Sequence, residues 1–168
     1  AVCAVVNGGN LMQPYVVGKI TDAAGNVVST TEPTVRRQVI RSETSALMCE
    51  MMEGVVDGGS GKNAYVAGYR VGGKTGTSQK LDSEDEEARI ASFVGIAPAD
   101  DPKIAVLIAL DEPHTFANGG GALAAPVAAQ VIEETLRYYG VQPQYTPEEQ
   151  QRLENQVPAV TELPAEAA

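Results

Sequence analysis

The 168-residue sequence contains no tryptophan, one histidine and two cysteines, and aromatic residues make up only 5% of it. A structural zinc site of the usual kind needs four Cys or His ligands, so His114, Cys3 and Cys49 are too few to form one. Cys3 lies in an apolar run and Cys49 in a predicted helix, so both thiols are expected to be buried and free, with a disulfide as the alternative. Cysteine and histidine usage therefore implies no metal.

Positive charge is also scarce. The chain has 12 Lys and Arg against 22 Asp and Glu, a formal net charge of -10 and a pI of about 4.5. This balance argues against nucleic acid and against an anionic membrane surface as partners. Acidic residues gather at 82–87 and in the C-terminal tail, where we expect solvated surface. The longest apolar run, 104–110, is far shorter than the roughly 20 residues that a helical membrane span needs.

The first part of the chain is predicted to hold a helix end, a hairpin and a long helix. The apolar residues 1–6 run into a glycine-rich helix stop, so we interpret the chain as a fragment that begins near the end of a helix. Strand-forming residues on both sides of 22–25 predict a short hairpin, and 33–40 is expected to be a connector. Ser42 is the predicted N-cap of the next helix. Its buried face is expected to carry Leu47, Met48, Met51, Met52, Val55 and Val56.

The second part is predicted to form a three-stranded antiparallel meander and a further helix. The segment around 72–80, followed by 91–96 and 104–110, supplies the strands. A glycine-rich loop at 118–121 leads to Pro126 near the first position of a helix that ends at Gly140. Residues 1–140 are thus expected to form the folded part, and 141–168 a Pro- and Glu-rich tail or linker. The fold class is α+β, with about three main strands and a small hairpin flanked by helices.

The motif Lys74-Thr75-Gly76-Thr77 is the strongest chemical signal in the chain. Side chains alternate along a strand, so Lys74 and Gly76 should share one side while Thr75 and Thr77 share the other. One fixed cation, two hydroxyls and free backbone N–H groups suit an extended substrate with a carboxylate. Gly76 leaves room for a ligand or another domain to approach the backbone. Taken alone, a Lys-Thr-Gly sequence is more typical of a solvated lysine in a Gly/Thr-rich turn.

The flanking sequence closely resembles the class B penicillin-binding proteins, a family of D,D-transpeptidases. The likeness runs from Ala67-Gly68-Tyr69-Arg70-Val71-Gly72-Gly73 through the motif to Ser92-Phe93-Val94-Gly95-Ile96-Ala97-Pro98. It continues through Asp101-Pro102-Lys103, Leu110-Asp111-Glu112-Pro113, Gly119-Gly120-Gly121 and Ala125-Pro126-Val127, and covers residues 1 to 140. Within the family the chain is most similar to division- and sporulation-type enzymes of Gram-positive bacteria. The resemblance implies part of the penicillin-binding, serine β-lactamase-like fold.

The resemblance also implies roles for the motif. Lys74 would supply positive potential and assist proton transfer, and the Thr77 N–H would form half of the oxyanion hole. Thr75, Gly76 and Thr77 would bind substrate, with both hydroxyls on the carboxylate of a terminal D-alanine or of a β-lactam. The reaction would be acyl transfer between peptidoglycan stem peptides through a serine ester, with no metal or organic cofactor.

Two of the three family motifs are absent from the chain. No serine has a lysine three residues later or an asparagine two residues later, so neither Ser-x-x-Lys nor Ser-x-Asn occurs. The fragment alone is therefore expected to be inactive and to need the N-terminal part of its own transpeptidase domain as a partner. The resemblance further implies an extracytoplasmic position on the bacterial membrane, an anchor upstream of residue 1 and a membrane glycan polymerase as a possible further partner.

Other readings of the sequence compete with this one. Gly68-Tyr69-Arg70-Val71-Gly72-Gly73-Lys74-Thr75 matches the phosphate-binding P-loop pattern literally, although such a loop should open directly into a helix. A non-catalytic β-lactam sensor or wall-binding relative would keep the same fold. A serine β-lactamase shares the Lys-Thr-Gly chemistry, but the flanking strands favour a transpeptidase. His114, between a proline and a glycine cluster, is expected to be a solvated loop residue rather than a base.

Overall fold

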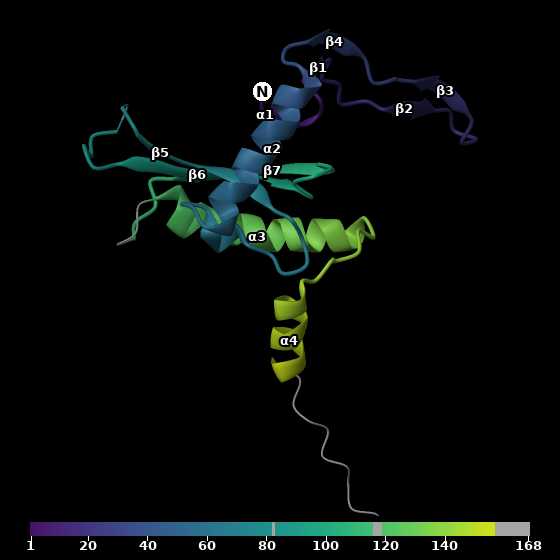
Figure 1. Ribbon diagram of the computed structural model, residues 1–168. Helices are drawn as coiled ribbons and strands as arrows, with labels where there is room; N and C mark the ends of the chain where they lie inside the picture. Colours follow the sequence, from purple (N-terminus) through teal and green to yellow (C-terminus); the bar gives the residue numbers. More distant parts are fainter. Residues whose placement is uncertain (82, 116–118, 157–168) are drawn as a thin grey trace, which may run out of the picture.

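A computed structural model describes residues 1–81, 83–115 and 119–156 (Figure 1). Its main sheet has three antiparallel strands in the order β5 (Gly72–Gln79), β6 (Arg89–Ala97) and β7 (Ile104–Asp111). Lys74 pairs with Val94 and Thr77 with Ala91. The predicted meander is confirmed, with the motif strand β5 at one edge of the sheet.

Two helices cover opposite faces of this sheet (Figure 1). The helix α3 (Gly120–Tyr138) lies along one face, and α2 (Ser42–Asp57) crosses the other. Phe93 on β6 packs with Ile132 and Leu136 of α3, and all three side chains are fully buried. Ile96, three residues further along β6, instead packs in the second cluster with Met52. Each such burial contributes about 1.5–3 kcal/mol, so these contacts fix both helices on the sheet.

The N-terminal arm consists of α1 (Val2–Val6) and two small strand pairs. The predicted hairpin is confirmed: β2 (Lys19–Thr21) pairs with β3 (Val27–Thr30), and Asp22 accepts hydrogen bonds from the amides of the turn. The predicted connector 33–40 is wrong, because it contains β4 (Val35–Gln38), which pairs with β1 (Asn10–Met12). This pairing joins segments far apart in the chain, so no local pattern announces it.

The long helix α2 begins where it was predicted, but its details differ. Ser42 is its first residue rather than its cap, and Arg41 in the cap position makes no side-chain capping bond. The predicted buried face is partly wrong, since Leu47 and Met51 are 50% and 57% exposed. The residues that α2 buries are Ser45, Cys49, Met52 and Val56. Contacts with α1 and β5 rotate the helix toward these smaller side chains, which share one face at helical spacing.

The cysteine prediction is half confirmed. Cys49 is buried and free, whereas Cys3, which was expected to be buried, is exposed. Burial raises the pKa of the Cys49 thiol. The apolar pattern of residues 1–6 did not indicate that Cys3 faces outward.

The helix α3 begins six residues before Pro126, which was predicted to lie near its first position. Pro126 lies inside α3, whose first residue is Gly120 in the predicted glycine-rich loop. A Cβ at Gly120 would lie 1.9 Å from the carbonyl oxygen of Ser92, so the glycine allows the helix to begin against β6. The predicted end is confirmed by Gly140, which has a φ of +72° just after the helix.

The predicted tail is not uniform. Residues 147–156 form α4 (Pro147–Gln156), and a short 3₁₀ helix, η1 (Lys62–Ala64), precedes the main sheet. The side chain of Glu149 in α4 is buried against the folded part. The division of the chain at residue 140 stays a prediction, and residues 157–168 lie outside the described part. Within the described residues, no helix combines the length and the hydropathy that a membrane span requires.

Candidate active site

The motif strand β5 places Lys74 and the two threonines on opposite faces of the sheet, as predicted. Lys74 is exposed, and its Nζ donates a hydrogen bond to the Thr75 carbonyl oxygen at 2.6 Å. Among the described residues Lys74 makes no ion pair, so its charge is free to act on a bound group. A free ammonium on an open strand is what binding of a carboxylate needs.

The two threonine hydroxyls are fixed by neighbouring elements. The Oγ1 of Thr75 lies 3.1 Å from the Oγ of Ser60, in the loop after α2. The Oγ1 of Thr77 accepts a hydrogen bond from the backbone N–H of Gly120 at 3.2 Å. Gly120 opens α3, so the Thr77 hydroxyl satisfies one of the unpaired donors of that helix. Within residues 1–81, 83–115 and 119–156, Thr77 Oγ1 donates no hydrogen bond, so its proton can be donated to an anion.

The lack of a side chain at Gly76 is explained within the sheet. A Cβ at Gly76 would lie 2.5 Å from the Oγ of Ser92, its partner on β6. The carbonyl oxygen of Gly76 also lies close to Gly120, where a Cβ would come within 2.5 Å of it. A side chain at position 76 would therefore require the Ser92 hydroxyl to move, and the closeness of the Gly76 carbonyl excludes a side chain at Gly120.

The far end of β5 is tied to the end of β7 by one lysine. Lys80 Nζ lies 3.0 Å from a carboxylate oxygen of Asp111 and 3.0 Å from one of Glu112. Hydrogen bonds to these two carboxylates raise the pKa of Lys80. Glu112 adopts a φ of +48°, a left-handed conformation that is uncommon for residues other than glycine. These contacts fix the two strand ends beside the exposed His114, which is solvated as predicted.

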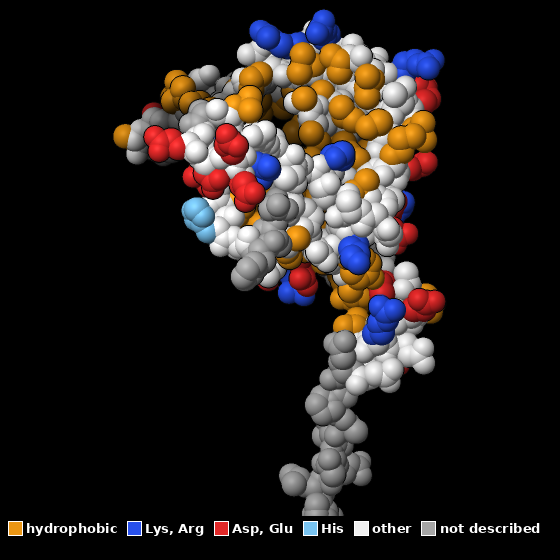
Figure 2. Space-filling model, turned by 90° about the vertical axis from the view of Figure 1, so that its left-hand side faces the viewer, with side chains coloured by type: hydrophobic (Ala, Val, Ile, Leu, Met, Phe, Trp, Pro, Cys, Tyr) orange, Lys and Arg blue, Asp and Glu red, His pale blue; other side chains and the backbone are white. Residues whose placement is uncertain are grey.

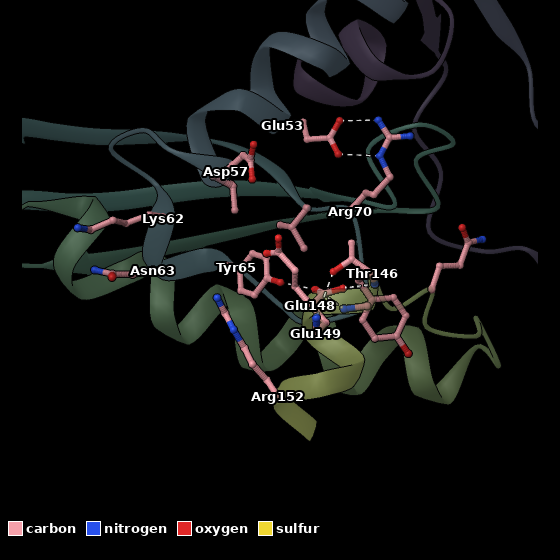
Figure 3. Close-up of a pocket in the computed structure, with 15 residues that line it drawn as sticks. Glu53, Asp57, Lys62, Asn63, Tyr65, Arg70, Thr146, Glu148, Glu149 and Arg152 are labelled. Carbon is pink, nitrogen blue, oxygen red and sulfur yellow. Dashed lines mark hydrogen bonds and ion pairs between the residues drawn. The ribbon is translucent and has the colours of Figure 1, made fainter. Parts of the chain in front are cut away.

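The loop that leads into β5, residues 65–71, is anchored by Arg70. Its Nε and Nη2 donate to the two carboxylate oxygens of Glu53 at 2.6 Å each (Figure 3). Its Nη1 lies 3.1 Å from a carboxylate oxygen of Asp100. The hydrogen bonds to Glu53 raise the pKa of Arg70 above its usual value. Arg70 therefore joins the loop to α2 and to the turn after β6.

Sequence reasoning missed the partner of this loop. Glu149 accepts hydrogen bonds from the Tyr65 hydroxyl, from the Gly68 amide at 3.1 Å and from the Thr146 amide at 2.6 Å (Figure 3). Burial by itself would raise the pKa of Glu149, but these bonds outweigh burial and lower it to about 2. The hydrogen bond from the Tyr65 hydroxyl to Glu149 raises the pKa of Tyr65 to about 12. The sequence Thr146-Pro147-Glu148-Glu149, a capping box with proline at the first helical position, was the available signal.

Two cavities lie near the ends of the sheet, and neither is lined by the residues of the motif. One, of about 650 Å³, is bordered by α2, η1, the loop 65–71 and α4 (Figure 3). The other, of about 740 Å³, lies between the turn 85–89 and residues 112–115. The motif lies on the edge strand β5, outside both of these cavities. No group of three His, Cys, Asp or Glu side chains within the described ranges is arranged to hold a metal ion.

The P-loop alternative is contradicted by the backbone. A phosphate-binding loop must open into a helix directly after its Lys-Thr pair. Here β5 continues through Thr75 as a strand to Gln79, and every residue of it pairs with β6. The match to the phosphate-binding pattern is therefore accidental.

Comparison with known proteins gives the same family by sequence and by structure. The model of the penicillin binding protein transpeptidase domain matches residues 1–133. Stage V sporulation protein D of Bacillus subtilis is 43% identical over 146 residues, which cover 85% of this chain and 23% of that protein. The probable peptidoglycan D,D-transpeptidase FtsI of Caulobacter vibrioides is 38% identical over 160 residues, covering 84% of this chain and 25% of that protein.

Solved structures with a similar fold belong to the same family. The D,D-transpeptidase domain of a peptidoglycan glycosyltransferase from Eggerthella lenta has a TM-score of 0.70 and 31% identity, and the match covers 84% of this chain and 31% of that one. The imipenem acyl-enzyme complex of penicillin-binding protein A from M. tuberculosis has a TM-score of 0.68 and 28% identity, over 80% of this chain and 29% of that one. The expected penicillin-binding fold is confirmed. The chain spans about a quarter of the length of these curated relatives.

Proposed function

Because this chain belongs to the penicillin-binding protein transpeptidase family, we propose that it is the substrate-binding part of a peptidoglycan D,D-transpeptidase that also binds β-lactams. The observation that carries this proposal is the edge strand β5. It presents a free lysine on one face and two fixed threonine hydroxyls on the other.

The substrate would bind along β5. Among the described residues β5 pairs only with β6, so its other edge can accept an extended stem peptide as an added strand. The hydroxyls of Thr75 and Thr77 would hold the terminal carboxylate. Lys74 would supply positive potential beside the serine hydroxyl of the Ser-x-Asn motif and assist transfer of a proton to the leaving group. Thr77 and Lys74 are the two residues to which we assign catalysis.

Oxyanion stabilisation would come from the Thr77 amide. The serine oxygen adds to the carbonyl carbon of the penultimate D-alanine, the carbonyl oxygen becomes an oxyanion, and its collapse expels D-alanine. An amine of a second stem peptide then displaces the serine and forms the crosslink. Removing one oxyanion-hole donor costs on the order of 10²–10³ in kcat, so the position of Thr77 on its strand controls the rate.

The nucleophile must come from outside these 168 residues, since Ser-x-x-Lys is absent from them. An exposed apolar surface supports this division of the site. Hydrophobic side chains gather over the upper part of the face shown in Figure 2. The large exposed apolar residues of the N-terminal arm and α2 are Tyr15, Val16, Val17, Ile20, Val27, Val28, Val35, Val39, Leu47 and Met51. Apolar surface of this extent favours burial against another folded part, here the remainder of the transpeptidase domain.

The same family membership supports a location outside the cytoplasm, where stem peptides are crosslinked. We further propose a membrane anchor upstream of residue 1, and as a partner a glycan polymerase that delivers new glycan chains.

The test is an intact mass measurement after incubation with a β-lactam. The full-length protein should gain one covalent adduct, and a protein limited to residues 1–168 should gain none. A full-length Thr77→Val variant keeps the backbone N–H but loses the hydroxyl that would hold the carboxylate. It should acylate about 10 to 10² times more slowly, because a hydrogen bond to a charged group is worth about 1.5–3 kcal/mol. Lys62→Met, at an exposed lysine on η1, should acylate normally. Absence of an adduct on the full-length protein would contradict the proposal. An adduct without crosslinking of stem peptides would indicate a β-lactam sensor instead.

A further inference from the structure

The C-terminal segment satisfies both backbone polar groups of one buried glycine in the loop before β5. The Gly68 N–H donates to Glu149 Oε1 at 3.1 Å, and its carbonyl oxygen accepts from the Gln144 N–H at 2.6 Å. Gly68 has a φ of +76°, and a Cβ there would lie 2.7 Å from atoms of Pro143 and Tyr145. A buried amide or carbonyl without a hydrogen-bond partner destabilises the folded state, so the loop needs this segment.

Glu149 is the centre of the contact, and both of its carboxylate oxygens are used (Figure 3). Oε1 accepts from the Tyr65 hydroxyl as well as from Gly68, and Oε2 accepts from the Thr146 amide at 2.6 Å. In return the Glu149 amide donates to Thr146 Oγ1 at 3.2 Å. The carboxylate is thereby held at the start of α4, and it holds the loop at two points, a side chain and a backbone amide.

The loop transmits this position to β5. Its turn is closed by a hydrogen bond from the Tyr69 N–H to the Val66 carbonyl, and both side chains are buried in the main core. The Arg70 carbonyl then accepts from the Ala99 amide at 2.7 Å. Gly72 begins β5 directly after Val71. Only three residues separate Gly68 from Gly72, the first residue of β5, so a displacement of Gly68 displaces the start of the motif strand.

We propose that Glu149 is a positioning residue for the transpeptidase reaction, which fixes the loop 65–71 so that β5 presents Lys74 and Thr77 in productive geometry. This inference rests on the proposed function. Glu149 lies on α4 and touches none of the motif residues, so it acts through the loop. Misplacement of a binding strand by about 1 Å is sufficient to cost up to about 10²-fold in rate.

The experiment measures β-lactam acylation kinetics on the full-length protein, well below its unfolding temperature. Glu149→Gln keeps one carbonyl oxygen as acceptor, and Glu149→Ala removes both oxygens. Tyr65→Phe removes only the hydroxyl donor. We expect the acylation rate constant to fall about threefold to tenfold in Glu149→Gln and Tyr65→Phe and more steeply in Glu149→Ala, while the dissociation constant of the non-covalent complex changes less. Glu148→Gln, the exposed neighbouring carboxylate, is the matched control and should leave both constants unchanged.

The outcomes separate positioning from stability. Variants with a lowered melting temperature but wild-type acylation constants would overturn the inference, because Glu149 would then stabilise the fold without positioning the strand. Slowed acylation in Glu148→Gln equal to that in Glu149→Gln would also overturn it, since general charge loss would explain both. A wild-type protein that forms no adduct would instead contradict the proposed function itself.

Discussion

The hydroxyl oxygen of Thr77 lies 3.2 Å from the backbone nitrogen of Gly120, and this hydrogen bond joins the motif strand to the first residue of α3. The threonine that is assigned to substrate binding therefore also caps a helix. In the proposed site, substrate would bind the proton of this hydroxyl, while its oxygen accepts from Gly120.

Replacing Thr77 tests both uses at once. Thr77→Val keeps the β-branched shape and removes the hydroxyl, so we expect a loss of about 1 kcal/mol in the free energy of unfolding from the missing cap. The acylation rate constant should fall by more than this small loss of stability can explain, because the variant remains folded. Thr77→Ser, which keeps the hydroxyl, should retain most of the stability and most of the acylation rate. Thermal unfolding and acylation rates of the full-length variants provide the measurements, and equal acylation by the valine and serine variants would contradict the role of the hydroxyl.

Gly120 is predicted to be intolerant of any side chain. In Gly120→Ala the new Cβ would meet the Ser92 carbonyl at 1.9 Å and the Gly76 carbonyl at 2.5 Å, so α3 must move away from β6. We expect a loss of at least about 1–3 kcal/mol, as for overpacked cores, and slower acylation. Gly54→Ala on α2 is the control, because nothing lies within 4 Å of its Cβ position. That substitution should leave stability unchanged or raise it by up to about 1 kcal/mol, since alanine favours the helix.

The buried hydroxyl of Ser45 is predicted to fix α1 on α2. Its Oγ donates to the Val5 carbonyl at 2.5 Å and accepts from the Gly8 amide at 3.0 Å. Ser45→Ala leaves both groups without this partner, so the free energy of unfolding should fall by about 1–3 kcal/mol. Ser42→Ala, at the position that sequence alone marked as the cap, should change it by less than about 0.5 kcal/mol. Denaturant unfolding of the two variants compares them, and a larger loss in Ser42→Ala would contradict the observed geometry.

The Tyr65–Glu149 pair predicts how stability depends on pH. The pKa of Glu149 is about 2 in the folded protein and near 4.5 when unfolded, so its contribution is complete above about pH 4.5 and is lost as pH falls toward 2. Tyr65 behaves in the opposite sense. Its pKa rises from 10 to about 12 on folding, so its contribution is present below pH 10 and is lost as pH rises toward 12.

Melting temperatures of wild type and Tyr65→Phe across both ranges test this expectation. The difference between the two proteins should be constant from about pH 5 to pH 9 and should shrink above pH 10. A difference that changes steadily through neutral pH would show that another group controls the contact.

Elements whose signals are local could be predicted from the amino-acid sequence. The meander, the hairpin around Asp22 and the end of α3 at Gly140 follow from strand formers, turn residues and a glycine that can adopt a positive φ. The alternation of Lys74 with Thr75 and Thr77 also followed, because strand geometry has a period of two. The family was identified from the order of short motifs along the chain, which the comparisons confirmed.

Features that depend on distant partners could not be predicted from local sequence. The pairing of β1 with β4, the outward position of Leu47 and Met51, and the start of α3 at Gly120 are set by contacts between segments far apart in the chain. Local propensity differs too little between the two faces of a helix, or between a connector and a short strand, to outweigh such packing. The hydrogen bonds from Gly68 and Tyr65 to Glu149 show this most clearly. Gly68 lies 81 positions before Glu149 in the chain and Tyr65 lies 84 positions before it, so these residues meet only when the chain has folded.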